Sequence, residues 1–188
     1  MEVLTKESFL KRKKEMISEM ISGKIFVYPT DTIYGIGCNA LKTSRVKKIR
    51  EIKNRDAKPF SVIAPSKEWI RENCVIDSCG EKWLNKLPGA YTFIFELKEE
   101  AVSSAVIGKR DNLGIRIPNN WFASIIEETG IPFVTTSVNI SGEKHIESVD
   151  ELNENIFKEI DYVVDDGELR GNPSTVVLLI NGEEKIIR

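Results

Sequence analysis

The chain has 188 residues, of which 41% are hydrophobic and 30% are charged, and its net charge at pH 7 is −2. This composition is typical of a globular protein and excludes the shortage of apolar residues that marks disordered chains. No stretch approaches the roughly 18 consecutive apolar residues of a membrane-spanning helix, and the polar, lysine-rich residues 1–14 lack the apolar core of a secretory signal. We therefore expect a single domain over residues 1–188, without a membrane partner and located in the cytoplasm.

The predicted elements begin with a helix, because apolar residues recur at helical spacing from residue 9 to residue 21. Thr5 or Ser8 could cap this helix, and Gly23 would end it. A strand at 25–28 follows, and apolar residues at 46, 49 and 52 mark one side of a second helix. Further along, the pattern predicts strands at 60–64, 91–97, 113–117, 133–138, 162–164, 175–180 and 185–188, and helices after Pro65, at 121–129 and at 149–159. This alternation predicts an α/β sheet covered by helices.

Cysteine and histidine are too few and too scattered for common metal or hydrolase sites. The three cysteines, Cys38, Cys74 and Cys79, lack the spacing of zinc ligands, so we expect free thiols and no metal held by the protein. The one histidine, His145, is not accompanied by a Gly-x-Ser-x-Gly elbow, which disfavours a Ser-His-Asp hydrolase.

Charge is unevenly distributed along the chain. Residues 44–58 carry seven basic and two acidic side chains, whereas residues 143–170 carry ten acidic and three basic ones. A local basic cluster in a nearly neutral protein indicates a bound anion, although for most of these lysines a solvated helix face is the simpler interpretation. Lys53 and Arg55 would diverge by about 200° on a helix, so they can share a ligand only if the helix ends there. Asp56 and Pro59 favour that ending, and a short cationic loop with Lys58 nearby suits a polyphosphate.

Four polar loops, at 28–32, 114–118, 135–142 and 172–175, lie next to predicted strands, where ligands of α/β proteins gather. Most of their residues are ordinary turn formers. Arg116 is harder to explain, because within a strand it would point away from the face that its two isoleucine neighbours share. If that face is covered, its guanidinium needs a carboxylate or a phosphate.

Six motifs, in chain order and covering nearly the whole chain, resemble those of the YrdC/Sua5 family. They are YPTDTIYG (28–35), KNR (53–55), PGAYTF (88–93), GIRIP (114–118), TSVNISG (136–142) and PSTV (173–176). The length is similar to that of the short, single-domain YrdC form. The resemblance implies a twisted, mixed and largely open sheet flanked by helices, with a concave basic cleft.

The resemblance also implies threonylcarbamoyl-AMP synthase activity. Such an enzyme is a nucleotidyltransferase that converts L-threonine, bicarbonate and ATP, with Mg²⁺, into L-threonylcarbamoyladenylate and pyrophosphate. A threonylcarbamoyl transferase then uses the product for the t6A37 modification of tRNA.

The family's functional residues carry over onto matching positions of this chain. In the family, the Lys-x-Arg and Ser-x-Asn motifs handle the nucleotide and its phosphates, and here they fall on Lys53, Arg55, Ser137 and Asn139. Lys58 and Arg188 are expected to assist in ATP binding. The threonine pocket carries over onto Thr32, Arg116 and Ser174, with Arg116 taking the substrate carboxylate. In this interpretation Gly35 and Gly37 let the backbone approach the ligand.

The chain departs from many Sua5-type relatives at Ile63, where those relatives have a histidine. No side chain in the motifs is an obvious general base, so we expect catalysis by positioning and charge neutralisation. Two alternatives stay open. One is a module that binds double-stranded RNA or tRNA without this activity, and the other is a relative that adenylates a different carbamate, as in hydrogenase maturation.

Overall fold

The computed structural model describes residues 1–55, 58–140 and 144–188. Its strands are β1 (Glu2–Thr5), β2 (Phe26–Tyr28), β3 (Gly35–Gly37), β4 (Ser61–Ile63), β5 (Tyr91–Glu96), β6 (Asn112–Arg116), β7 (Phe133–Ser137), β8 (Tyr162–Asp165), β9 (Thr175–Ile180) and β10 (Glu183–Ile186). Its helices are α1 (Lys6–Lys11), α2 (Lys13–Ser22), α3 (Thr43–Ile52), α4 (Lys67–Asn73), α5 (Ser78–Leu84), α6 (Ser104–Ile107), α7 (Trp121–Thr129) and α8 (Glu154–Glu159), with a 3₁₀ turn at Val149–Glu151. None of the helices in these three ranges is long and apolar enough to cross a membrane.

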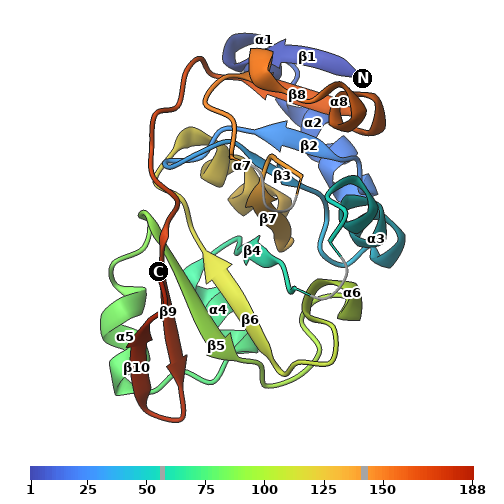
Figure 1. Cartoon of the computed structure of the whole chain (residues 1–188). Coiled ribbons are helices and arrows are strands. Elements are labelled where there is room, and N and C mark those ends of the chain that lie inside the picture. The colour runs from blue at the N-terminus through green and yellow to red at the C-terminus, as the bar shows by residue number, and fades with distance from the viewer. Residues whose placement is uncertain (56–57, 141–143) are drawn as a thin grey trace.

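The strands form one mixed sheet flanked by helices, in the order β1-β8-β2-β3-β7-β4-β6-β5-β9-β10 (Figure 1). The sheet contains both parallel pairs, such as β2 with β8 and β4 with β6, and antiparallel pairs, such as β2 with β3 and β5 with β6. The prediction of a mixed, open α/β sheet is confirmed.

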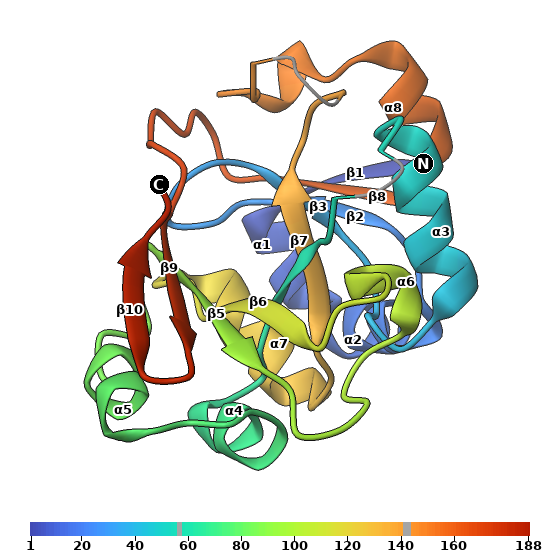
Figure 2. The same ribbon diagram turned by 60° about the horizontal axis from the view of Figure 1, so that its bottom comes forward.

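Strand β7 joins the two halves of the sheet, and Figure 2 shows it in the middle of the molecule, between β3 and β4. Its last residues, Thr136 and Ser137, pair with β3, while Thr135 and the residues before it pair with β4. Gly37 makes this junction feasible, because a Cβ at that position would lie 1.8 Å from the carbonyl oxygen of Val134. The close approach that Gly37 permits is therefore one between strands.

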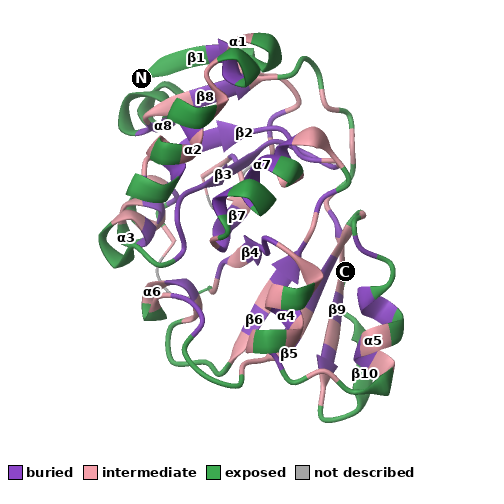
Figure 3. Ribbon diagram, turned by 180° about the vertical axis from the view of Figure 1, so that it is seen from behind, coloured by how far each residue is buried: buried purple, intermediate pink, exposed green. Residues whose placement is uncertain are grey.

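Two clusters of buried side chains form the core, and Figure 3 shows buried strands behind helices whose outer faces are exposed. In the smaller cluster, Phe9 and Met16 from the first two helices meet Phe122 of α7, and all three pack on strand residues. The ring of Phe122 stacks on that of Tyr28 at 4.5 Å. This packing fixes the end of β2, from which the next loop leaves.

Local signals predicted several element ends correctly. Thr5 caps α1 by accepting a hydrogen bond from the backbone N–H of Ser8, and Gly23 ends α2 in the left-handed region at φ 102°. Two predicted helices are interrupted in the structure: the first at Arg12, and the one at 149–159, which is a short 3₁₀ turn followed by α8 from Glu154. Helix α3 ends at Ile52, as the interpretation of Lys53 and Arg55 requires, whereas the proposed stop residue Asp56 lies outside the described residues.

Candidate active site

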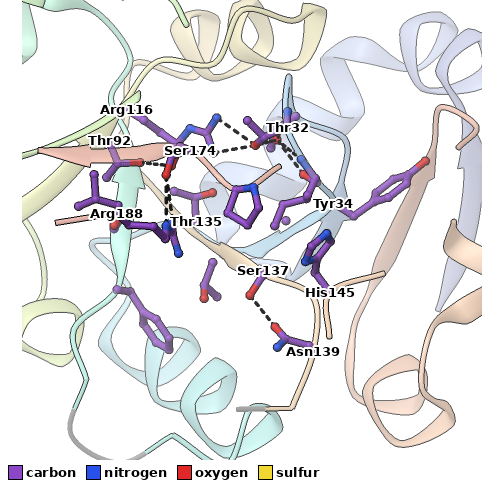
Figure 4. Close-up of a pocket in the computed structure, with 18 of the residues that line it drawn as sticks. Thr32, Tyr34, Thr92, Arg116, Thr135, Ser137, Asn139, His145, Ser174 and Arg188 are labelled. Carbon is purple, nitrogen blue, oxygen red and sulfur yellow. Dashed lines mark hydrogen bonds between the residues drawn. The ribbon is translucent and has the colours of Figure 1, made fainter. Parts of the chain in front are cut away.

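A cavity of about 380 Å³ lies beside the end of β7, a volume within the usual range for ligand pockets (Figure 4). Its wall is built from the loop after β2, the end of β6, the end of β7 and the segment that enters β9. The four polar loops of the sequence therefore meet at one place. Of the predicted site residues, those on the wall are Thr32, Arg55, Arg116, Ser137, Asn139, Ser174 and Arg188.

Arg116 is the last residue of β6, and its side chain is almost completely covered, with only 7% of its surface exposed. One terminal nitrogen donates to Asp31 at 2.5 Å, and both terminal nitrogens lie 3.3 Å from the hydroxyl of Thr32. Burial lowers the pKa of Arg116, while the carboxylate of Asp31 acts in the opposite direction. The remaining guanidinium nitrogen, Nε, is buried and has no hydrogen-bond partner among the described residues.

The loop after β2 is held by its own hydroxyls. Thr30 Oγ1 lies 2.9 Å from Thr32 Oγ1 and donates to the carbonyl of Ile33 at 2.7 Å. The backbone of Thr32 is also covered by the segment before β9, because a Cβ at Gly171 would lie 2.0 Å from the Thr32 carbonyl oxygen. This close contact holds the segment before β9 against the loop after β2.

A second pair of hydroxyls also lines the cavity: Thr92 and Ser174 are both buried, and their hydroxyl oxygens are 2.7 Å apart (Figure 4). Arg188 Nε and Nη2 donate to the carbonyl of Ser174 at 3.2 and 3.1 Å. The last residue of the chain therefore places a cation at the cavity wall, although its side chain is exposed.

Lys53 is buried behind the wall, with 2% of its surface exposed. Its ammonium donates to the carbonyls of Ser137 and Asn139 at 2.5 and 2.7 Å and to the side-chain oxygen of Asn139 at 3.1 Å. Ser137 Oγ in turn donates to the same Asn139 oxygen at 2.5 Å. Burial and the nearby Arg55 lower the pKa of Lys53 to about 7. Ser141 and Gly142, which complete this motif, lie outside the described residues.

Arg55 reaches the cavity from the end of α3. It donates to the hydroxyl of Thr136 at 3.3 Å and to the carbonyl of Pro59 at 2.6 Å, and its guanidinium lies 5.0 Å from the ring centre of Phe60. Burial lowers its pKa. Lys58, in contrast, is exposed and is not on the described wall; its carbonyl accepts from Arg55 at 3.2 Å.

Several residues on or behind the cavity wall could not be assigned a role from the sequence. Thr92 and Asp31 stand within the quoted motifs, but neither their spacing nor their type distinguishes them from turn or strand residues. Tyr34 lines the cavity and donates its hydroxyl to the carbonyl of Gly167 at 2.7 Å, and burial raises its pKa to about 12. His145 also lies on the wall. Ile63, where many relatives have histidine, is fully buried in the smaller core cluster.

Within the described parts of the chain, no three His, Cys, Asp or Glu side chains gather closely enough to hold a metal ion. The donors on the cavity wall are cations, hydroxyls and amides, which suit anionic and polar ligands. A hard cation such as Mg²⁺ prefers oxygen ligands and often binds through substrate phosphates. This donor set therefore does not fit a resident metal and fits one that arrives with a phosphate ligand.

Comparison with known proteins gives one consistent result. The family model of Sua5, YciO and YrdC proteins, described as "Telomere recombination", matches residues 18–188. A protein of Methanocaldococcus jannaschii, provisionally named threonylcarbamoyl-AMP synthase, is 38% identical over 173 residues, covering 90% of this chain and 80% of that protein. The threonylcarbamoyl-AMP synthase of Haemophilus influenzae is 30% identical over 173 residues, covering 87% of this chain and 92% of that protein.

Among solved structures, Sua5 of Pyrococcus abyssi complexed with L-threonine superimposes with a TM-score of 0.88 at 27% identity. All of the present chain is covered, but it spans only 57% of the length of that Sua5 chain.

Proposed function

Because the chain belongs to the Sua5/YciO/YrdC family, we propose that it is a threonylcarbamoyl-AMP synthase, a nucleotidyltransferase that joins L-threonine, bicarbonate and ATP. The observation that carries this proposal is that one cavity combines a buried arginine flanked by hydroxyls with two further arginines on its wall. An α-amino acid needs a carboxylate partner and close polar contacts, and a triphosphate needs several cationic and amide donors. Both kinds of donor are present within about 380 Å³.

In this proposal the amino acid lies against Arg116, Thr32 and Ser174. The unpartnered Nε of Arg116 is a donor in need of an acceptor, which a substrate carboxylate would supply. The hydroxyls of Thr32 and Ser174 are buried and oriented by neighbouring threonines, so they can accept or donate to the substrate without first being ordered.

The nucleotide lies on the side of Arg55, Ser137, Asn139 and Arg188. Arg55 and Arg188 neutralise phosphate charge, while Ser137 and Asn139 offer a hydroxyl and an amide. Lys53 acts on this side through Ser137 and Asn139, and Lys58 is left as a peripheral cation. Mg²⁺ would be held by the phosphates of ATP.

The chemistry proceeds in two steps. The neutral amine of threonine first attacks CO₂ with loss of a proton, or bicarbonate with loss of water, and either route gives a carbamate. A carbamate oxygen then attacks the α-phosphorus in line, the bond from that phosphorus to the bridging oxygen breaks, and pyrophosphate leaves with the electron pair. The chain's contribution is to place the two anions side by side and to lower their repulsion.

The test incubates the full chain with ATP, Mg²⁺, bicarbonate and L-threonine, measures pyrophosphate and identifies the nucleotide product by mass spectrometry. We expect pyrophosphate release to require both threonine and bicarbonate and the product to have the mass of threonylcarbamoyl-AMP. Release that is equally fast without either compound would exclude this function. Reactions with L-serine and with D-threonine show whether the cavity selects the side chain and the hand of the amino acid.

The product is a reactive mixed anhydride, so a partner must consume it. We propose that the acceptor is tRNA, through a threonylcarbamoyl transferase. Adding such a transferase and tRNA to the reaction should move the threonylcarbamoyl group from AMP to the tRNA.

A further inference from the structure

We infer that Asp31 is a positioning residue that fixes the guanidinium of Arg116 for the carboxylate of the amino-acid substrate. This inference rests on the proposed function, because it assumes that Arg116 receives that carboxylate. Asp31 belongs to the loop after β2, and Arg116 ends β6, so the pair connects two strands that are not neighbours in the sheet.

The carboxylate of Asp31 is held from two sides. Oδ1 accepts from Arg116 Nη2 at 2.5 Å, and Oδ2 accepts from the backbone N–H of Asn119 at 2.8 Å. The neighbouring Asn120 donates its side-chain amide to the carbonyl of Pro29 at 2.8 Å. Two bonds thus lock the loop after β2 onto the segment between β6 and α7, and Asp31 cannot follow a movement of Arg116 without breaking one of them.

The hydrogen bonds of Arg116 are unevenly distributed over its guanidinium. A guanidinium has five N–H donors, and the three bonds to Asp31 and Thr32 all involve its terminal nitrogens. Nε is buried without a partner among the described residues, which is costly for a charged donor. Asp31 and Thr32 therefore hold one end of the guanidinium and leave an unsatisfied donor for an incoming acceptor.

A buried arginine without a counter-ion would also be expensive, because burial disfavours the charged form. Asp31 offsets this cost before substrate binds. A competing interpretation is that Asp31 occupies the place of the substrate carboxylate and must be displaced. The bond to Asn119 argues against displacement, because it ties the carboxylate to the backbone.

The substitution Asp31→Asn tests this inference. An asparagine has one oxygen in place of two, so either its bond to Arg116 or its bond to Asn119 is lost in any orientation. We expect KM for L-threonine to rise by about tenfold or more, because a charge-assisted hydrogen bond that orients Arg116 is removed. The values of kcat and of KM for ATP should change by less than about threefold.

Selectivity for the substrate carboxylate is a second measurement, and it would not change if Asp31 had only a structural role. Threoninamide lacks the carboxylate, so the ratio of kcat/KM for threonine to that for threoninamide measures carboxylate recognition. This ratio should fall in Asp31→Asn by about the same factor as the rise in KM. An unchanged ratio would overturn the inference, and a lower KM for threonine would show that Asp31 competes with the substrate.

Asp161→Asn is the matched control. Asp161 also bridges a cation and a backbone N–H, since it accepts from Lys24 Nζ at 3.2 Å and from the N–H of Ile25 at 2.9 Å. It is not on the described cavity wall. Its substitution should lower thermal stability as Asp31→Asn does, but leave KM and the selectivity ratio unchanged.

A binding measurement separates this inference from the proposed function. The increase in melting temperature that L-threonine produces needs no turnover. If the wild-type chain is stabilised by threonine but releases no pyrophosphate, the proposed reaction fails, whereas the role of Asp31 is still tested by loss of that stabilisation in Asp31→Asn. If this variant is too unstable to purify, Asp31→Glu keeps the charge but displaces the carboxylate, and the same fall in selectivity is expected.

Discussion

The ammonium of Lys53 donates to both oxygens of Asn139, at 2.7 Å to the backbone carbonyl and at 3.1 Å to the side chain. A third bond to the carbonyl of Ser137 uses the last of its three N–H donors. Lys53 caps the C-terminus of α3, so these bonds tie the end of a helix to the segment that leaves β7. Since Ser137 and Asn139 line the cavity, a substitution of Lys53 should alter the position of these wall residues.

The substitution Lys53→Met keeps the length of the side chain and removes its donors. We expect kcat/KM for ATP to fall by at least about tenfold, because three acceptors lose a charged donor and the segment carrying Ser137 and Asn139 is released. KM for threonine should change less. The measurement is steady-state kinetics with each substrate varied in turn. The control is Lys47→Met, on the exposed side of α3, which should leave the kinetic constants for both substrates unchanged.

The lowered pKa of Lys53 predicts a pH dependence. Above about 7 the neutral amine becomes populated, and it has one donor fewer for its three acceptors. We expect kcat/KM for ATP to decline as the pH rises through this value. In Lys53→Arg the side chain stays charged, so the decline should be absent even if the maximal rate is lower. A decline that persists in Lys53→Arg would show that another group titrates.

Stability should change in the opposite direction. Because burial lowers the pKa of Lys53 from 10.5 to about 7 in the folded chain, the unfolded chain binds more protons between these two values. The contribution of this residue to the free energy of unfolding therefore rises with pH across that window. Urea denaturation between pH 7 and pH 10 measures the free energy of unfolding of the wild type and of Lys53→Met. The wild type should gain stability relative to Lys53→Met as the pH rises, and this gain should shrink or vanish if the lysine is fully solvated.

The fold was largely predictable because its longer elements carry local signals. Helix α7 has the predicted bounds, since Asn120 caps its start and Gly130 ends it at φ 67°. Strand β1 was missed because its four residues are mostly exposed and gain order from pairing with β8, which lies far away in the sequence. Strand β3 was missed for a different reason: its three residues are buried, but two of them are glycines, which are weak strand formers.

Composition and spacing could place the polar loops at strand ends, but could not show which of their side chains contact one another in space. The sequence indicated that Arg116 needs an anion, yet it could not identify Asp31, which is 85 residues away and meets it only through the order of the strands. The burial of Lys53 was likewise hidden, because a lysine at a helix end is ordinarily exposed. Tertiary contacts decide which cation faces the cavity and which one supports its wall.

The exchange Arg116→Lys tests whether planar, forked donors are needed for the amino acid. A lysine keeps the charge but cannot bond Asp31, Thr32 and a carboxylate with the same geometry. We expect KM for threonine to rise by about tenfold or more, with a smaller change in KM for ATP. Arg116→Ala should have a larger effect in the same direction. Equal effects on both substrates would mean that Arg116 does not belong to the amino-acid side, and Arg110→Lys, at an exposed position, is the control.

The contact between Gly171 and Thr32 predicts a steric effect on the same pocket. In Gly171→Ala the new methyl group would overlap the Thr32 carbonyl oxygen, since the two atoms would lie only 2.0 Å apart, so one of the two segments must move. We expect a rise in KM for threonine together with a loss of stability. Gly130→Ala is the comparison, because nothing lies within 4 Å of a Cβ there and its cost is only the strain of a left-handed backbone, about 1 kcal/mol. Melting curves and threonine kinetics on both variants separate the effects: if Gly171→Ala loses stability but keeps the wild-type KM, the segment before β9 does not shape the amino-acid pocket.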